Sequence, residues 1–167
     1  MSRGFVKEDD QEEVPIVPQR AYLPEGVPNF VTSAGMDQLL AEKKMLIDER
    51  DNLSSANENE KRIAMNFINA KLQLLNDRIV EARIIDAKDQ PHGEIRFGAS
   101  VTLKTEVSGK IQVFQIVGVD EADIAKGKIS FISPLAKALI NKKAGDKVTL
   151  NRDRGETVFE IMEIGYP

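Results

Sequence analysis

The sequence lacks cysteine and tryptophan altogether, and it has a single histidine. Without cysteine the chain can form no disulfide, no thiolate metal site and no cysteine nucleophile. No apolar run approaches the roughly 18 residues that a membrane-spanning helix needs, so we expect no membrane partner. The N-terminus also lacks a basic segment followed by an apolar stretch. This argues against secretion and makes the cytoplasm the expected location.

Concentrated positive charge is also missing. The net charge is -4 over 167 residues, and each third of the chain mixes both signs. Residues 1–31 carry three basic and six acidic groups, residues 32–86 carry eight and ten, and residues 87–167 carry twelve and eleven. Duplex DNA binding calls for a concentrated face of lysine and arginine. Autonomous binding to DNA is therefore not expected.

What the chain does have is a long stretch of coiled-coil periodicity. In residues 32–86, apolar side chains recur at a period of about 3.5, which keeps one narrow line facing a partner helix. The first arm carries Leu39, Leu40, Leu46, Ile47 and Leu53, and the second carries Ile68, Leu72, Leu75, Ile79 and Ala82. The pattern predicts two helices of about 20 and 29 residues folded into an antiparallel hairpin.

Cap-forming residues mark where these helices begin. Thr32 or Ser33 is suited to cap the first helix. Ser55 followed by Glu58 fits a capping box, which predicts that the second helix begins near Ala56. The hairpin would then project from the rest of the chain.

The flanking segments differ from the hairpin in composition and in their pattern of apolar residues. Residues 1–31 are rich in acids and proline, which predicts an extended N-terminal arm without helix or interior strand. Residues 87–167 alternate apolar with polar side chains, which predicts several antiparallel strands and one short helix in a small α+β domain. The expected strands are 95–97, 100–103, 111–117, 128–132, 147–150 and 157–164, and the expected helix is 135–143.

The C-terminal segments resemble those of a known family. Residues 97–101, 114–118, 129–140 and 145–146 match, in order and spacing, the C-terminal domain of the bacterial GreA/GreB transcript-cleavage factors. The run from Ile129 to Ile140, with its Ser-Pro-Leu-Ala-x-Ala-Leu core, is the most specific part. The resemblance covers roughly residues 30–166 and leaves only the arm outside.

The resemblance implies both a fold and a function. The fold would be a coiled-coil hairpin followed by a domain similar to FK506-binding proteins. In that family the globular domain docks at the rim of the secondary channel of RNA polymerase, and the segment matching Ser133, Pro134 and Leu135 is associated with docking. The hairpin passes down the channel, and its acidic tip helps to hold a catalytic Mg²⁺ while the polymerase hydrolyses backtracked RNA. The protein would be a monomer and not itself an enzyme. It would need no cofactor of its own, since Mg²⁺ would be held only within the polymerase complex, and it would meet nucleic acid only there.

The hairpin tip departs from the family motif, Gly-Asp-x-x-Glu-Asn-Ala-Glu-Tyr. An alignment without gaps places Glu58 opposite the aspartate but Lys61 opposite the glutamate. The remaining tip carboxylates are Asp51, Glu58 and Glu60, with Asp51 and Glu58 expected to face each other across the turn. They could serve as Mg²⁺ ligands or be solvated charges at a helix start. Stimulation of RNA cleavage is therefore expected to be weak or lost.

Two functions from other classes stay open on the sequence alone. A domain similar to FK506-binding proteins could be a peptidyl-prolyl isomerase. The aromatic side chains available for such a pocket are Phe97, Phe114, Phe131, Phe159 and Tyr166. Because they fall at expected strand positions, these side chains are more simply explained as core residues than as the lining of an isomerase pocket. The hairpin could also belong to a coiled-coil adaptor that does not bind polymerase.

Overall fold

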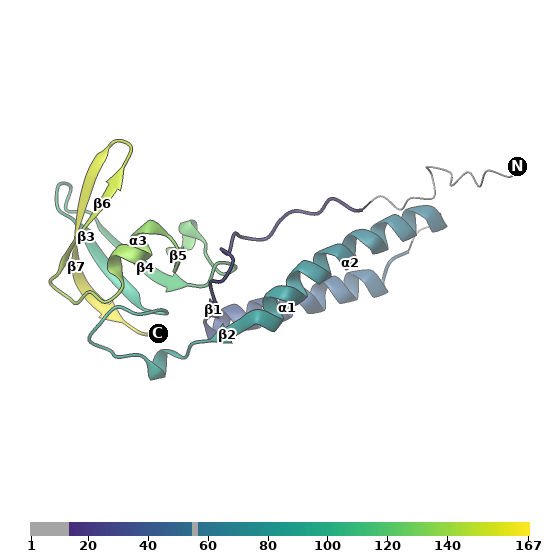
Figure 1. Cartoon of the computed structure of the whole chain (residues 1–167), viewed down its shortest axis with the longest axis horizontal. Coiled ribbons are helices and arrows are strands. Elements are labelled where there is room, and N and C mark those ends of the chain that lie inside the picture. Colours follow the sequence, from purple (N-terminus) through teal and green to yellow (C-terminus); the bar gives the residue numbers. More distant parts are fainter. Residues whose placement is uncertain (1–13, 55–56) are drawn as a thin grey trace, which may run out of the picture.

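The computed structural model describes residues 14–54 and 57–167, and it has two parts (Figure 1). A helical hairpin projects from a small, curled β-sheet domain, and a short two-stranded sheet lies between them. The elements are β1 (Asn29–Val31), α1 (Ser33–Asp51), α2 (Glu58–Glu81), β2 (Ala82–Ile84), the 3₁₀ helix η2 (Ala87–Asp89), β3 (Ser100–Thr105), β4 (Ile111–Val117), the 3₁₀ helix η3 (Ile124–Lys126), β5 (Lys128–Ser130), α3 (Pro134–Leu139), β6 (Lys147–Arg152) and β7 (Gly155–Gly165). The predicted α+β fold with an N-terminal hairpin is confirmed.

The hairpin is held together by one apolar line from each helix. Its buried side chains are Val31, Leu39, Leu46, Ile68, Leu72 and Leu75, with Ile47, Leu53 and Ile79 packed against them. Leu40 does not belong to this line, because its side chain is 46% exposed. Neighbouring residues on an α-helix point about 100° apart, and here Leu39 is buried in the contact with α2 while Leu40 is turned toward solvent.

The helix starts follow the local chemistry of their caps. The hydroxyl of Thr32 accepts a hydrogen bond from the Gly35 amide at 2.9 Å, as predicted for the first helix. The second helix begins at Glu58, and its cap is Asn57, whose side chain accepts from the Asn59 amide. The predicted cap at Ser55 and start near Ala56 lie outside the described residues.

The second helix is shorter than predicted and gives way to a strand. It ends at Glu81, because Ala82–Ile84 leave the helix to pair in parallel with Asn29–Val31. The same pairing makes the last three residues of the N-terminal arm a strand, which the proline-rich sequence did not predict. Both chain ends of the hairpin are thereby tied to each other at its base (Figure 1).

The globular domain is built on a five-stranded sheet with strand order β5-β4-β3-β7-β6. All its pairings are antiparallel except β4 with β5, which the sequence analysis expected to be antiparallel as well. They run parallel because the connection through η3 returns the chain alongside β4 in the same direction. The core between sheet and α3 includes Leu103, Ile116, Leu139 and Ile161, each at most 1% exposed.

Two predicted elements of this domain differ in the structure. The segment 95–97 is buried but forms no strand, because Ile95 pairs instead with the residues after α3: its amide donates to the Lys142 carbonyl and its carbonyl accepts from the Asn141 amide. The helix α3 ends at Leu139 instead of continuing to residue 143. Asn141 takes a left-handed backbone conformation with φ of 70°, which stops the helix.

Candidate functional site

The far end of the hairpin carries the predicted tip carboxylates. Asp51 is the last residue of α1 and Glu58 is the first of α2. Glu58 and Glu60 occupy the first turn of α2, where the helix dipole favours negative charge. The Asp51 carboxylate lies 3.8 Å from Nε of its neighbour Arg50. Both side chains are partly or largely exposed, so this ion pair contributes little to stability. The tip is therefore a solvated surface with carboxylates at its two helix ends.

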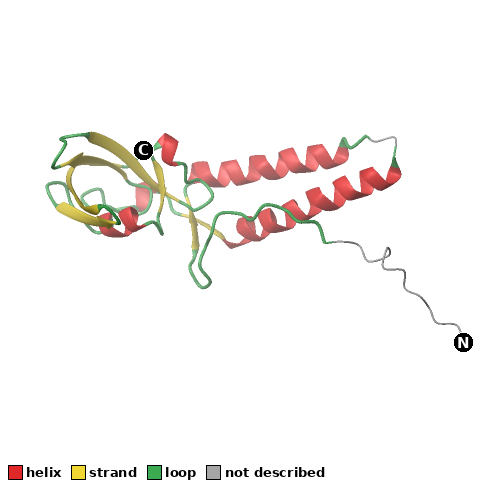
Figure 2. Ribbon diagram, turned by 90° about the horizontal axis from the view of Figure 1, so that it is seen from above, coloured by secondary structure: helices red, strands yellow, loops and turns green. Residues whose placement is uncertain are grey.

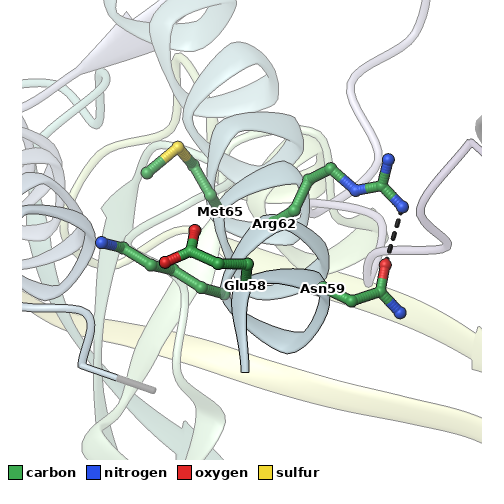
Figure 3. A pocket seen from close by; sticks show the side chains of 5 residues that line it. Glu58, Asn59, Arg62 and Met65 are labelled. Atoms are coloured by element: carbon green, nitrogen blue, oxygen red, sulfur yellow. Dashed lines mark hydrogen bonds between the residues drawn. The ribbon is translucent and has the colours of Figure 1, made fainter. Parts of the chain in front are cut away.

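Basic side chains lie among these carboxylates. A shallow cavity of about 560 Å³ at the start of α2 is lined by Glu58, Asn59, Lys61, Arg62 and Met65 (Figure 3). Arg62 donates a hydrogen bond of 2.7 Å to the Asn59 side chain, while the Glu58 carboxylate points away from that pair (Figure 3). Residues three apart share one face of a helix, so Lys61 lies on the same face as Glu58. The surface around Glu58 is thus of mixed charge.

The tip does not assemble a metal site by itself. Among the residues that the structure describes, no group of three or more histidine or acidic side chains could hold a metal ion. A hard cation such as Mg²⁺ needs several oxygen ligands in near-octahedral geometry. The described tip residues therefore present individual carboxylates and not a preformed ligand set.

The predicted docking residues begin α3 on the globular domain. Ser133 caps this helix, accepting a hydrogen bond from the Ala136 amide at 3.2 Å, and Pro134 occupies the first helical position, as predicted. Pro134 is exposed. Leu135 is only 8% exposed and belongs to the domain core. Of the three, Leu135 is thus chiefly a structural residue.

All three line an apolar groove of about 580 Å³, which we call the docking groove. It is lined by Thr105, Gln112, Phe114, Ile124, Ile129, Ser133, Pro134, Leu135, Leu150, Asn151, Arg152, Thr157 and Phe159. Ile124, on η3, is 82% exposed and unusually apolar for such a position. Ile124 was not among the predicted site residues. An isoleucine in the connection between two strands could have indicated an apolar contact surface there. The groove can accept apolar side chains of a partner.

The hairpin meets the globular domain at a tight junction, which we call the joint. Strand β1 contributes to both cores: Val31 packs into the hairpin core, while Phe30 packs against the globular core. The Phe30 ring lies 6.0 Å from Phe97 and 5.6 Å from Phe131, in tilted arrangements that aromatic pairs favour. Gly118 allows this approach, since a side chain there would meet the Phe30 carbonyl.

A buried glutamate completes the joint. The Glu121 side chain is 3% exposed and accepts a hydrogen bond from the Thr32 hydroxyl at the start of α1. Lys128 lies 3.7 Å from the other carboxylate oxygen. A negative charge at a helix N-terminus is favourable, so Glu121 binds the globular domain to α1. These contacts join the base of the hairpin to the globular domain.

Replacing Gly35 with alanine is expected to loosen the joint. A Cβ at Gly35 would lie 2.5 Å from the Glu121 carboxylate, which is held on both sides and cannot swing away cheaply. Alanine raises helix propensity by about 1 kcal/mol, but overpacking costs about 1–3 kcal/mol, so we expect Gly35→Ala to be neutral to destabilising. Urea unfolding measures the change. Gly93→Ala is the control, because nothing lies within 4 Å of that site. A clear gain in stability for Gly35→Ala would show that the joint is not tightly packed.

The fold and these surfaces define a class of protein in which a helical hairpin projects from a small sheet domain (Figure 1). Comparison with known proteins identifies the class. Residues 90–166 match the family model "Transcription elongation factor, GreA/GreB, C-term". The transcription elongation factor GreA of Alkalilimnicola ehrlichii is 39% identical over 130 residues, which cover 77% of this chain and 80% of that protein. GreA of Thioalkalivibrio sulfidiphilus is 43% identical over 101 residues, covering 60% of this chain and 64% of that protein.

The chain therefore belongs to the GreA/GreB family of transcription elongation factors, as the sequence resemblance indicated. Among solved structures, Gfh1 of Thermus thermophilus, a GreA factor homologue, is 25% identical with a TM-score of 0.40, over 83% of this chain and 99% of that one. Within the described ranges, no helix is both long and apolar enough to cross a membrane.

Proposed function

We propose that this elongation factor binds RNA polymerase, docks at its secondary channel and directs the hairpin toward the active site. The observation that carries the proposal is the projection of the hairpin from the globular domain (Figure 1). Its longer helix has 24 residues, or about 36 Å at 1.5 Å per residue. At the joint, β1 packs into both cores and so connects this helix pair to the domain that would dock. Such a shape suits delivery of a few side chains to a site deep inside a partner.

The globular domain supplies the docking surface in this proposal. The docking groove is lined in part by Ser133, Pro134 and Leu135, and it lies on the globular domain. An apolar groove with a polar rim is the usual form of a protein–protein contact. The partner would insert apolar side chains beside Ile124 and Pro134.

The factor would act through the active site of the polymerase and not as an enzyme itself. The tip carboxylates Glu58, Asp51 and Glu60 would approach a Mg²⁺ ion that the polymerase holds. This chain would then need no bound cofactor of its own. Contact with nucleic acid would occur only inside the elongation complex. We further propose that the factor is a cytoplasmic monomer. Membership of the family does not favour the two alternative functions, a prolyl isomerase and an adaptor without polymerase.

The docking assignment predicts a loss of affinity when charge enters the groove. Ile124→Asp places a carboxylate in the apolar groove at an exposed position, so the fold should survive. Burying an unpaired charge in an interface is costly, and we expect affinity for core RNA polymerase to fall at least about tenfold. Leu135→Asp is a poor test, because Leu135 belongs to the core. Affinity is measured by titrating labelled factor with polymerase.

Val107→Asp is the matched control for this experiment. Val107 is 97% exposed on the same domain and does not line the docking groove. Equal affinity of the Ile124→Asp variant and the wild type would place docking elsewhere. Failure of the wild type to bind polymerase at all would overturn the proposed function.

A further inference from the structure

The N-terminal arm contacts both parts of the molecule through Arg20. Its guanidinium donates two hydrogen bonds to the carboxylate of Glu42 on α1, at 2.8 and 3.0 Å. Its Nε donates a third, at 3.1 Å, to Asp120 of the globular domain. Arginine is suited to this role because its planar fork can bind a carboxylate with two parallel bonds. One side chain of the arm thus bridges hairpin and domain.

The next residue of the arm extends the contact to the second helix. The carbonyl of Ala21 accepts a hydrogen bond from the guanidinium of Arg78 on α2. Arg78 also lies 3.9 Å from the other oxygen of Asp120. Arg20 and Ala21 together therefore reach α1, α2 and the globular domain, and we call this set of contacts the arm clamp. Figures 1 and 2 show the arm alongside the hairpin, on its way back to the base.

Three of the charged clamp groups are largely shielded from water, which strengthens their interactions, whereas the Glu42 side chain is 37% exposed. The side chains of Asp120, Arg78 and Arg20 are 7%, 14% and 18% exposed. The hydrogen bond to Glu42 and the charge of Asp120 raise the pKa of Arg20 despite its partial burial. A buried carboxylate that loses its close partner is strongly destabilised. Without Arg20, Asp120 would keep only the longer contact to Arg78.

The clamp lies where a small rotation has a large effect. It joins α1 at Glu42 and α2 at Arg78 to the globular domain, and Glu58 at the tip lies about 30 Å from Arg78 along α2. A rotation of about 5° at the base would displace the tip by about 3 Å at that length. Displacements of about 1 Å from a productive geometry can cost about a hundredfold in rate.

We propose that Arg20 is a positioning residue: it locks the angle between hairpin and globular domain, so that the tip reaches one defined place when the domain is docked. The proposal rests on the proposed function for its consequence at the polymerase, but the locking itself is a property of the free protein. The arm is then part of the working structure and not a passive tail.

The locking can be measured without polymerase. Because the chain has no cysteine, Glu49→Cys near the tip and Val107→Cys on the domain give two unique sites for spin labels. In the full chain we expect one narrow distance distribution, and the same distribution with Gln19→Ala, the exposed neighbour of Arg20. Arg20→Ala should broaden or shift it, and Arg20→Glu, which opposes Glu42 and Asp120, should do so more strongly. Unchanged distributions in both variants would overturn the proposal.

A second measurement follows the tip inside the complex. An iron chelate attached at Glu49→Cys generates radicals that cut chain and RNA within reach. With Arg20→Ala we expect polymerase affinity within about twofold of wild type but cutting near the active site weaker and spread over more positions, because the chelate samples a wider region. A residue that only stabilised the fold would lower affinity and cutting together, and that result would contradict a positioning role. If wild-type factor does not bind polymerase, the proposed function fails, while the distance measurement still decides whether Arg20 locks the angle.

Discussion

Replacement of Leu75 by alanine is expected to destabilise the hairpin by about 2–5 kcal/mol. Leu75 is 0% exposed and packs in the buried apolar cluster between α1 and α2. Among the described residues this cluster has six buried side chains, so a cavity there removes a large share of its packing. Leu72→Ala, at 5% exposure, should behave in the same way. Urea unfolding followed by helix circular dichroism measures the loss.

Leu40→Ala is the matched control for the cavity variants. It removes the same atoms from the same helix pair, but Leu40 is 46% exposed and faces away from α2. Surface substitutions usually change stability by less than about 0.5 kcal/mol. A similar loss for Leu40→Ala and Leu75→Ala would mean that the helices pack in another register.

The hairpin was predictable because its core is local in sequence. Apolar residues repeat at fixed spacing along each helix, and a regular helix turns that spacing into one face. The error at Leu40 has a simple origin: two adjacent leucines both satisfied the pattern, and only geometry decides which one points inward. The caps at Thr32 and Ser133 were predictable for the same reason, since each bonds an amide three residues away.

The joint was not predictable, because its contacts join residues distant in sequence. Strand β1 is three residues long and pairs with a segment at the end of α2, so nothing in either stretch alone signals a strand. Similarly, the direction of β5 depends on how the connection from β4 folds back. The Ile95 segment looked like a strand because it is apolar, yet its backbone partners follow α3.

The functional surfaces likewise include parts that the sequence could predict and parts that it could not. The resemblance located the tip and the start of α3, because family motifs mark them. The clamp was not predicted: Arg20 contacts residues 22 and 100 positions away, and a lone arginine in a proline-rich arm carries no local pattern. The docking role of Ser133, Pro134 and Leu135 and the metal role of the tip acids stay predictions.

At the tip, we expect Lys61→Glu to raise RNA cleavage by the polymerase about tenfold or more over wild type. Glu58 and Lys61 line the same cavity and lie three residues apart on one helix face. An ammonium group there competes with a metal ion for the Glu58 carboxylate and repels the ion as well. Replacing it with a carboxylate removes the repulsion and adds a second ligand at the spacing of the family motif.

Cleavage is measured as RNA release from a backtracked elongation complex at saturating factor, so that differences in affinity do not enter. We expect weak cleavage with the wild type, less with Glu58→Ala, and no gain when Lys61→Glu is combined with Glu58→Ala, since the two carboxylates must act together. Lys110→Glu is the charge-matched control: it makes the same change at an exposed lysine of the globular domain, in the connection between β3 and β4. Strong wild-type cleavage that survives Glu58→Ala would refute the tip assignment. An equal gain from Lys110→Glu would trace the effect to overall charge and not to inhibition by Lys61 at the tip.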